Sequence, residues 1–216
     1  MPLTWIFDLD NTLHDAGRYV FPQVELQMDH YLARHLALSQ TEANALRARY
    51  YDLYGATLAG VVRHHRQIDP DHFLAETHLL PELPARLIPM RILRPSLKRL
   101  RGNKLLFTNG PQDYAETVLR LLGIAQHFDA VVSIEQVGHL AKPDIRAYRR
   151  MLARHRLNPR RCAMVEDTHA NLAPARRLGM RTVWLSPKLR RGPHVHARLR
   201  NLHQLPKLAR QRGWHR

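Results

Sequence analysis

The sequence predicts an α/β fold in which a Rossmann-like parallel sheet carries helices on both faces and an all-helical segment is inserted near the start. Apolar runs alternate with amphipathic segments over most of the 216 residues, a pattern typical of such sheets. From about His14 to Pro89, by contrast, no convincing strand occurs. We therefore expect an α/β core of residues 1–13 and 90–216, with residues 14–89 as a helical cap.

The composition is that of a globular protein. Hydrophobic residues make up 44% of the chain and charged residues 24%, enough apolar material for a sizeable core. No window approaches the ~18 consecutive apolar residues of a membrane helix, and no secretory signal opens the chain. The single cysteine, Cys162, excludes an internal disulfide and is expected to fill the core. These features favour a cytoplasmic protein without a membrane partner.

The helices expected in the insertion are supported by end signals. Ser39 followed by Glu42 is a capping-box pattern, and Gly55 is expected to end the same helix. Asp69-Pro70 is a typical helix start. The predicted helices span about residues 21–36, 39–54 and 69–79. Prolines between residues 81 and 95 predict an irregular connector.

The expected core elements alternate strictly. Strands are predicted at residues 4–7, 104–107, 128–133, 162–165 and 182–185. Helices are predicted at about residues 111–122, 144–155 and 171–178, and Gly123 and Gly179 follow two of them as expected C-terminal residues. The chain therefore has the strand–helix–strand units of a parallel sheet.

The net charge of +16 is the unusual global property. A basic extension begins at about Pro187 and has nine Lys or Arg and no acidic residue. A basic surface attracts anions, which makes nucleic acid a candidate partner, but no nucleic-acid-binding motif occurs and we favour a solvated face. Apolar residues at three- and four-residue spacings predict that part of the extension packs on the domain. They are Val195, Leu199, Leu202, Leu205 and Leu208.

Polar side chains follow three of the predicted strands. They are Asp8 and Asp10, Thr108 and Asn109, and Glu166 and Asp167, with Lys142 in a loop before a helix. Because the carboxyl ends of parallel strands meet at one edge, these groups are expected to converge. Burying several carboxylates beside one lysine is costly unless a divalent cation joins them, and oxygen ligands suit Mg²⁺. The fifteen histidines show no partner carboxylates at metal-ligand spacing, so they are expected to be solvated.

Four segments carry a family resemblance. Asp8-Leu9-Asp10-Asn11-Thr12 resembles the DxDxT signature of the haloacid dehalogenase superfamily of phosphohydrolases. Its second, third and fourth motifs resemble, in order, Phe107-Thr108-Asn109-Gly110, Lys142-Pro143-Asp144 and Val165-Glu166-Asp167-Thr168. One such pentapeptide is a weak signal, but four motifs in order are a strong one. The resemblance covers the chain from about Thr4 to Ser186.

The resemblance implies a catalytic role for both aspartates of the first motif. Asp8 is expected to be the nucleophile that forms an aspartyl-phosphate. Asp10 is expected to protonate the leaving alkoxide and then to help deprotonate the attacking water. Dehalogenases of the family lack the second aspartate, so the resemblance implies a phosphatase or a phosphotransferase.

The resemblance also implies a Mg²⁺ site and a phosphate site. Mg²⁺ is expected to bind the Asp8 carboxylate, the Asp10 backbone carbonyl and Asp167, with Glu166 either a ligand or a residue that supports one. Asn171 stands where many relatives have a later acidic residue, which leaves the exact ligand set open. The residues expected to bind phosphoryl oxygens are Thr108 and Lys142, with an added contact from Asn109.

Further details resemble the pyrimidine 5′-nucleotidases of the family, which would hydrolyse UMP- or CMP-type substrates. These details lie in residues 7–14, 50–60 and 166–179. Tyr54 is the candidate to stack on the base, although packing within the cap explains it as well. His14 is expected at the cap interface or at the surface. The expected partner is thus a small phosphorylated metabolite, in the first place a nucleoside monophosphate.

Two alternatives remain open at this point. One is another enzyme of the family: a sugar-phosphate or phosphoglycolate phosphatase, or an enzyme similar to β-phosphoglucomutase. The other is a nucleic-acid-binding protein that uses the basic extension, with the fold as a scaffold. The second alternative leaves the filled motif positions without a purpose.

Overall fold

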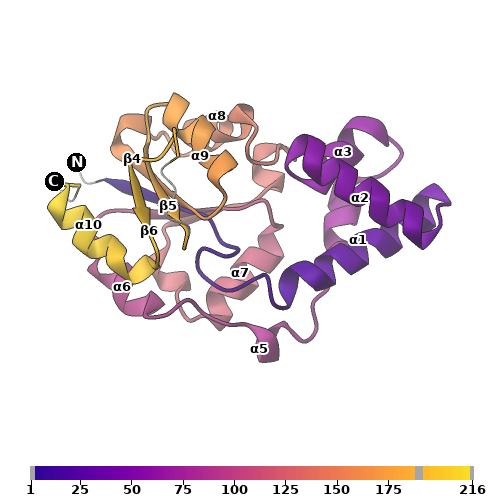
Figure 1. The fold of residues 1–216 in the computed structure, drawn as a ribbon, viewed down its shortest axis with the longest axis horizontal. Coiled ribbons are helices and arrows are strands. Elements are labelled where there is room, and N and C mark those ends of the chain that lie inside the picture. The colour runs from indigo at the N-terminus through magenta and orange to yellow at the C-terminus, as the bar shows by residue number, and fades with distance from the viewer. Residues whose placement is uncertain (1–2, 188–191, 215–216) are drawn as a thin grey trace.

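A six-stranded parallel sheet forms the centre of the computed structural model, which describes residues 3–187 and 192–214. The strand order is β3-β2-β1-β4-β5-β6, so the chain builds outward from β1 to one edge and then from β4 to the other (Figure 1). In such sheets the site lies where the direction reverses, at the carboxyl ends of β1 and β4. The strands span Thr4–Phe7 (β1), Lys104–Phe107 (β2), Ala130–Val132 (β3), Cys162–Glu166 (β4), Arg181–Leu185 (β5) and Ala197–Leu199 (β6).

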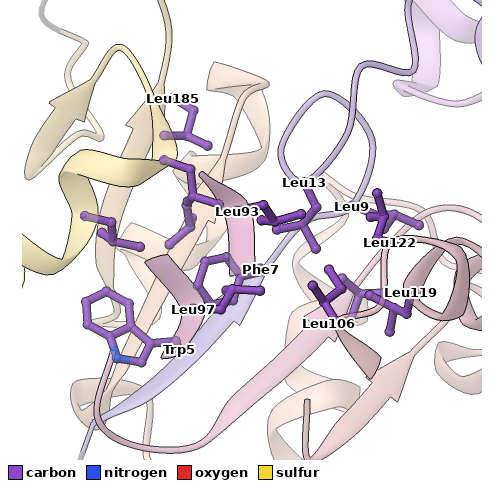
Figure 2. Packing of buried hydrophobic residues seen from close by; sticks show 14 of the residues in the cluster. Trp5, Phe7, Leu9, Leu13, Leu93, Leu97, Leu106, Leu119, Leu122 and Leu185 are labelled. Carbon is purple, nitrogen blue, oxygen red and sulfur yellow. The ribbon is translucent and has the colours of Figure 1, made fainter. Parts of the chain in front are cut away.

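Side chains alternate between two buried faces of the sheet. Trp5 and Phe7 of β1 enter one apolar cluster, whereas Ile6 enters the other. The first cluster is covered by α6 (Leu93–Arg99), α7 (Gln112–Leu121) and α10 (Leu205–Gln211), and Figure 2 shows its packing around Phe7. The second is covered by α8 (Ile145–Arg154) and α9 (His169–Arg177). The predicted sheet with helices on both faces is confirmed, and Cys162 is a buried core residue as expected.

The insertion between β1 and β2 is helical, as predicted. Its helices are α1 (Val20–Leu36), α2 (Gln40–Tyr54), α3 (Thr57–His64), α4 (Pro70–Thr77) and α5 (Leu83–Arg86), followed by α6. The capping box of Ser39 and Glu42 is present, and Gly55 ends α2 with a φ of 79°. None of the helices within the described residues combines the length and apolar character that a membrane crossing requires.

Within the described residues, four helices were missing from the prediction: α3, α5, α6 and α10 of the basic extension. α3 begins two residues after Gly55, which ends α2. Its N-cap residue is Ala56, which has no side-chain hydrogen bond to mark the start of a helix in the sequence. α5 and α6 lie in the stretch that was expected to be an irregular connector, and that expectation was wrong. Pro84 and Pro95 both fall in the first turn of a helix, where the missing N–H would have no partner in any case.

Two connections join the insertion to the sheet, and they run side by side. The Asp15 N–H donates to the Ile88 carbonyl at 2.8 Å, and the Met90 N–H donates to the Leu13 carbonyl at 3.0 Å. α1 to α3 lie to one side of the sheet in Figure 1. The insertion has a third apolar cluster, which includes Tyr31 and Phe73 and reaches Ile134 and Ala141 beyond β3. A division into core and cap at residues 14–89 stays a prediction.

The basic extension packs on the domain, as expected. Leu199, Leu202 and Leu205 are buried in the first cluster, and the Trp214 ring lies 6.3 Å from the Trp5 ring. The strand β6 was not predicted, because the spacing of its apolar residues resembles that of a helix. Residues 188–191, where the extension starts, lie outside the described residues.

Candidate active site

A buried lysine joins the ends of three strands. The Lys142 ammonium donates to Asp8 Oδ1 at 2.6 Å, to Glu166 Oε2 at 2.9 Å and to the Phe107 carbonyl at 2.9 Å. These partners end or directly follow β1, β4 and β2, and Lys142 is only 1% exposed. The convergence predicted from the strand ends is therefore present.

The loop that carries Lys142 is fixed by the end of β2. The Asn109 carboxamide accepts from the Lys142 N–H at 2.8 Å and donates to the Lys142 carbonyl at 3.1 Å. From the other side, Gly55 lies so close that a Cβ there would be 2.7 Å from Pro143 Cδ. These two bonds use the Asn109 oxygen and one of its two side-chain N–H donors, so the amide mainly fixes the Lys142 loop.

Thr108 also reaches this edge and is 1% exposed. Its hydroxyl oxygen accepts from the Gly110 N–H at 2.9 Å, which leaves the hydroxyl hydrogen available to an oxygen ligand. Its role in phosphate binding stays a prediction, as does that of Lys142.

The site holds more negative charge than Lys142 can balance. Burial, and then repulsion from Glu166, raises the pKa of Asp8 to about 7 although Lys142 lowers it. Burial likewise raises the pKa of Glu166 to about 7, and that of Asp167 is raised by burial and by Asp8. Burial lowers the pKa of Lys142, but Asp8 and Glu166 outweigh it, so the net shift is upward. The carboxylates favour either protons or a further cation.

Three of these carboxylates can hold that cation. One oxygen from each of Asp8, Glu166 and Asp167 lies within 4.8 Å of the others. The donor set consists of oxygens, which is what Mg²⁺ prefers. Trp184 fixes the Asp167 backbone by donating from Nε1 to its carbonyl at 2.7 Å. The residues present therefore fit a magnesium ion.

Glu166 already has four hydrogen-bond donors. Its Oε1 accepts from the backbone N–H groups of Asp167 and Thr168, each at 3.1 Å. Its Oε2 accepts from Lys142 and from the Asn171 amide at 3.2 Å. Asn171 thus supports Glu166. This arrangement favours Asp8 and Asp167 as direct ligands and Glu166 as their support.

Asp10 lies beside the acidic cluster and is held by two donors. Tyr114 donates its hydroxyl to Asp10 Oδ1 at 2.6 Å, and His14 Nε2 lies 2.9 Å from the same oxygen. Burial would raise the pKa of Asp10, but these partners outweigh it and lower that pKa. The turn that brings His14 back passes through Asn11 at a φ of 57°, a conformation that asparagine tolerates well.

His14 is fully buried, so its alternative placement at the surface was wrong. Tyr114 was missed by the sequence reasoning. The sequence does offer a sign of its role. Tyr114 lies in the first turn of the helix that follows the Thr108–Gly110 motif, and that turn lies at the carboxyl-end edge of the sheet, where the site is.

Tyr54 lies at the end of α2, half-buried. Its hydroxyl is 2.7 Å from His64 Nε2, and the Arg63 guanidinium lies 5.7 Å from its ring centre. These contacts lie within the insertion, and stacking on a base stays a prediction.

A family model of haloacid dehalogenase-like hydrolases matches residues 4–179. The chain belongs to this family. The match contains all four motifs, and it leaves out the basic extension.

Among curated proteins, the chain is similar to Phosphate metabolism protein 8 of Saccharomyces cerevisiae, with 28% identity over 192 residues. The alignment covers 82% of this chain and 59% of that protein. Phosphoserine phosphatase of Thermus thermophilus is 38% identical over 94 residues, or 43% of this chain and 37% of that enzyme. The chain thus spans about three fifths or less of the length of these relatives.

Among solved structures, a HAD phosphatase from Thermococcus onnurineus superposes with a TM-score of 0.67 and 24% identity. The superposition covers 96% of this chain and 97% of that one. At this identity the likeness shows that the fold is shared, insertion and sheet together.

We predict that Mg²⁺ raises the melting temperature of the protein, because a cation relieves the repulsion among Asp8, Glu166 and Asp167. Asp167→Asn removes a ligand and should abolish most of this increase in thermal-shift measurements. Asp113→Asn, an exposed position on α7, is the matched control and should keep the increase. Equal shifts in all three proteins would contradict the assignment of the metal site.

Proposed function

We propose that this chain is a Mg²⁺-dependent phosphomonoester hydrolase that works through an aspartyl-phosphate on Asp8. The observation that carries the proposal is the Lys142 ammonium between Asp8 and Glu166, with Asp167 and Asp10 beside them. Phosphoryl transfer depends mainly on positioning and on neutralising charge, and this cluster offers both. The phosphatases among the similar curated proteins support the same reaction class.

In the first step, a carboxylate oxygen of Asp8 attacks the phosphorus while the bond from phosphorus to the ester oxygen breaks. Asp10 gives a proton to the departing oxygen. As the Asp8 oxygen turns to phosphorus, the Lys142 donor that it accepts in the free protein becomes available to a phosphoryl oxygen. Lys142 and the Thr108 hydroxyl then offset the phosphoryl charge. Mg²⁺, held by Asp8, Asp167 and the Asp10 carbonyl, would add positive charge next to the phosphoryl group.

In the second step, water attacks the phosphorus of the aspartyl-phosphate and gives a proton to Asp10. The bond between phosphorus and the Asp8 oxygen breaks, phosphate leaves, and both aspartates return to their starting states. Each step uses Asp10 in the opposite sense, as acid and then as base.

The contacts of Asp10 suit this double use. His14 and Tyr114 favour the carboxylate form, which is the base needed for water. A bound phosphoryl dianion acts in the other direction, because like charges raise the pKa of a neighbouring carboxyl group. Substrate binding would therefore help to load Asp10 with the proton that the leaving group requires.

For the substrate, we propose a pyrimidine nucleoside monophosphate. The support is the resemblance in residues 7–14, 50–60 and 166–179, together with the place of Tyr54 at the end of α2. The contact of Gly55 with Pro143 brings that end of α2 to the loop of Lys142. Tyr54 is accordingly our candidate for contact with the base.

We expect purified protein to release phosphate from UMP and CMP faster than from AMP, GMP, phosphoglycolate and sugar phosphates. EDTA should stop the reaction, and Asp8→Asn should abolish it, because the amide is a far weaker nucleophile. Phosphate assays over this panel, each with and without Mg²⁺, measure both effects.

The pattern of activity separates the alternatives. Turnover centred on a sugar phosphate would keep the mechanism and overturn the pyrimidine assignment. Turnover only with a bisphosphate donor would indicate a mutase. Tight, salt-sensitive RNA or DNA binding that survives Asp8→Asn, without turnover, would indicate the nucleic-acid-binding alternative.

Tyr114→Phe should lower kcat by ~10-fold or more and leave KM nearly unchanged, since a hydrogen bond to a charged group contributes about 1.5–3 kcal/mol. The loss should shrink with nitrophenyl phosphate, whose good leaving group needs little protonation. Tyr51→Phe, at an exposed position of α2, is the control. An equal loss on all substrates would show that Tyr114 acts on structure alone and not through Asp10.

A further inference from the structure

Two histidines and a glutamate converge in the helical insertion. His35 comes from α1, and His72 and Glu76 come from one face of α4, four residues apart. One ligand atom from each lies within 4.8 Å of the other two. The expectation that the histidines lack a carboxylate at metal-ligand spacing was therefore wrong for this cluster. Its third member is distant in the sequence, and only the packing of α1 on α4 brings it there.

Other residues hold two of these side chains in place. The Tyr31 hydroxyl lies 2.8 Å from His72 Nδ1, and His72 Nε2 faces Glu76 Oε1 at 3.1 Å. Arg34 binds the other oxygen, Oε2, of the same glutamate. A metal-binding histidine commonly has such a partner on its second ring nitrogen, and a metal-binding carboxylate is commonly hydrogen-bonded as well.

The third side chain of the cluster, His35, is also held in a fixed orientation. His35 stacks on the buried Tyr31 ring, with the ring centres 4.0 Å apart and the planes 16° from parallel. It meets the His72 ring edge to face at 5.7 Å. Tyr31 thus contacts both histidines and restricts their rotation, so the loss of side-chain freedom on binding a ligand would be small.

We propose that His35, His72 and Glu76 form a zinc-class metal site that links α1 to α4. Imidazole nitrogens with one carboxylate suit Zn²⁺, and three protein ligands leave a fourth position for water. Binding requires His72 in the tautomer with its proton on Nδ1, donated to the Tyr31 oxygen, so that Nε2 is free for the metal. Mg²⁺ prefers oxygen ligands and belongs at the acidic cluster instead. The proposal does not rest on the proposed function.

The test is calorimetric titration of the whole chain with Zn²⁺, in excess Mg²⁺, which competes for the acidic cluster. We expect one tight equivalent in the native protein, with at least tenfold weaker binding or its complete loss in His35→Ala/His72→Ala. His30→Ala, another exposed histidine of α1, is the matched control and should keep the tight equivalent. Glu76→Gln, which keeps the side-chain shape, should weaken binding as well.

A second readout follows the helices themselves. Zn²⁺ should raise the melting temperature of the native protein and of His30→Ala but not that of the double variant, because the metal joins two helices. Circular dichroism of each variant checks that it is folded. Unchanged zinc affinity and stoichiometry in the folded double variant, or zinc binding only at other sites, would overturn the proposal.

Discussion

A buried ammonium in contact with two carboxylates ties together the ends of three strands. Lys142 joins Asp8, which follows β1, to Glu166, which ends β4. Through the Phe107 carbonyl it also binds β2, the neighbour of β1 on the other side. Taking these charges out of water is costly, and it is tolerated only because every donor of Lys142 is used. One lysine does not neutralise the cluster. Burial first, and then repulsion between neighbouring carboxylates, raises the pKa values of Asp8 and Glu166 to about 7 although Lys142 lowers them. The cluster therefore favours either protons or a further cation.

A second dependence runs from the helical insertion to the acid–base residue. His14, which holds Asp10, lies in the first connection to the insertion and pairs there with Pro89 of the second connection. The end of α2 in turn packs on the loop of Lys142. Movement of the insertion would therefore change the contacts of both Asp10 and the Lys142 loop. This coupling gives a physical route by which a bound leaving group could influence the chemistry at the sheet edge.

Much of this arrangement was predictable because it follows from local patterns. Apolar runs that end in Asp8, Thr108 and Glu166 place the reactive groups at one edge of the sheet, whatever the details of packing. Contacts between distant parts of the chain were not predictable in this way. Tyr114 meets Asp10 across 104 positions, and His35 meets His72 only after α1 and α4 have packed. β6 was missed because it is three residues long and its apolar spacing resembles that of a helix.

The proposed role of Asp8 as the nucleophile can be tested directly. Enzyme quenched during turnover of its best substrate would be reduced with borohydride, which converts an aspartyl-phosphate to homoserine, and its peptides would be analysed by mass spectrometry. If Asp8 carries the phosphoryl group, homoserine will be found at position 8 and will depend on both substrate and Mg²⁺. Steady phosphate release with Asp8 unmodified, or with homoserine at another aspartate, would contradict it.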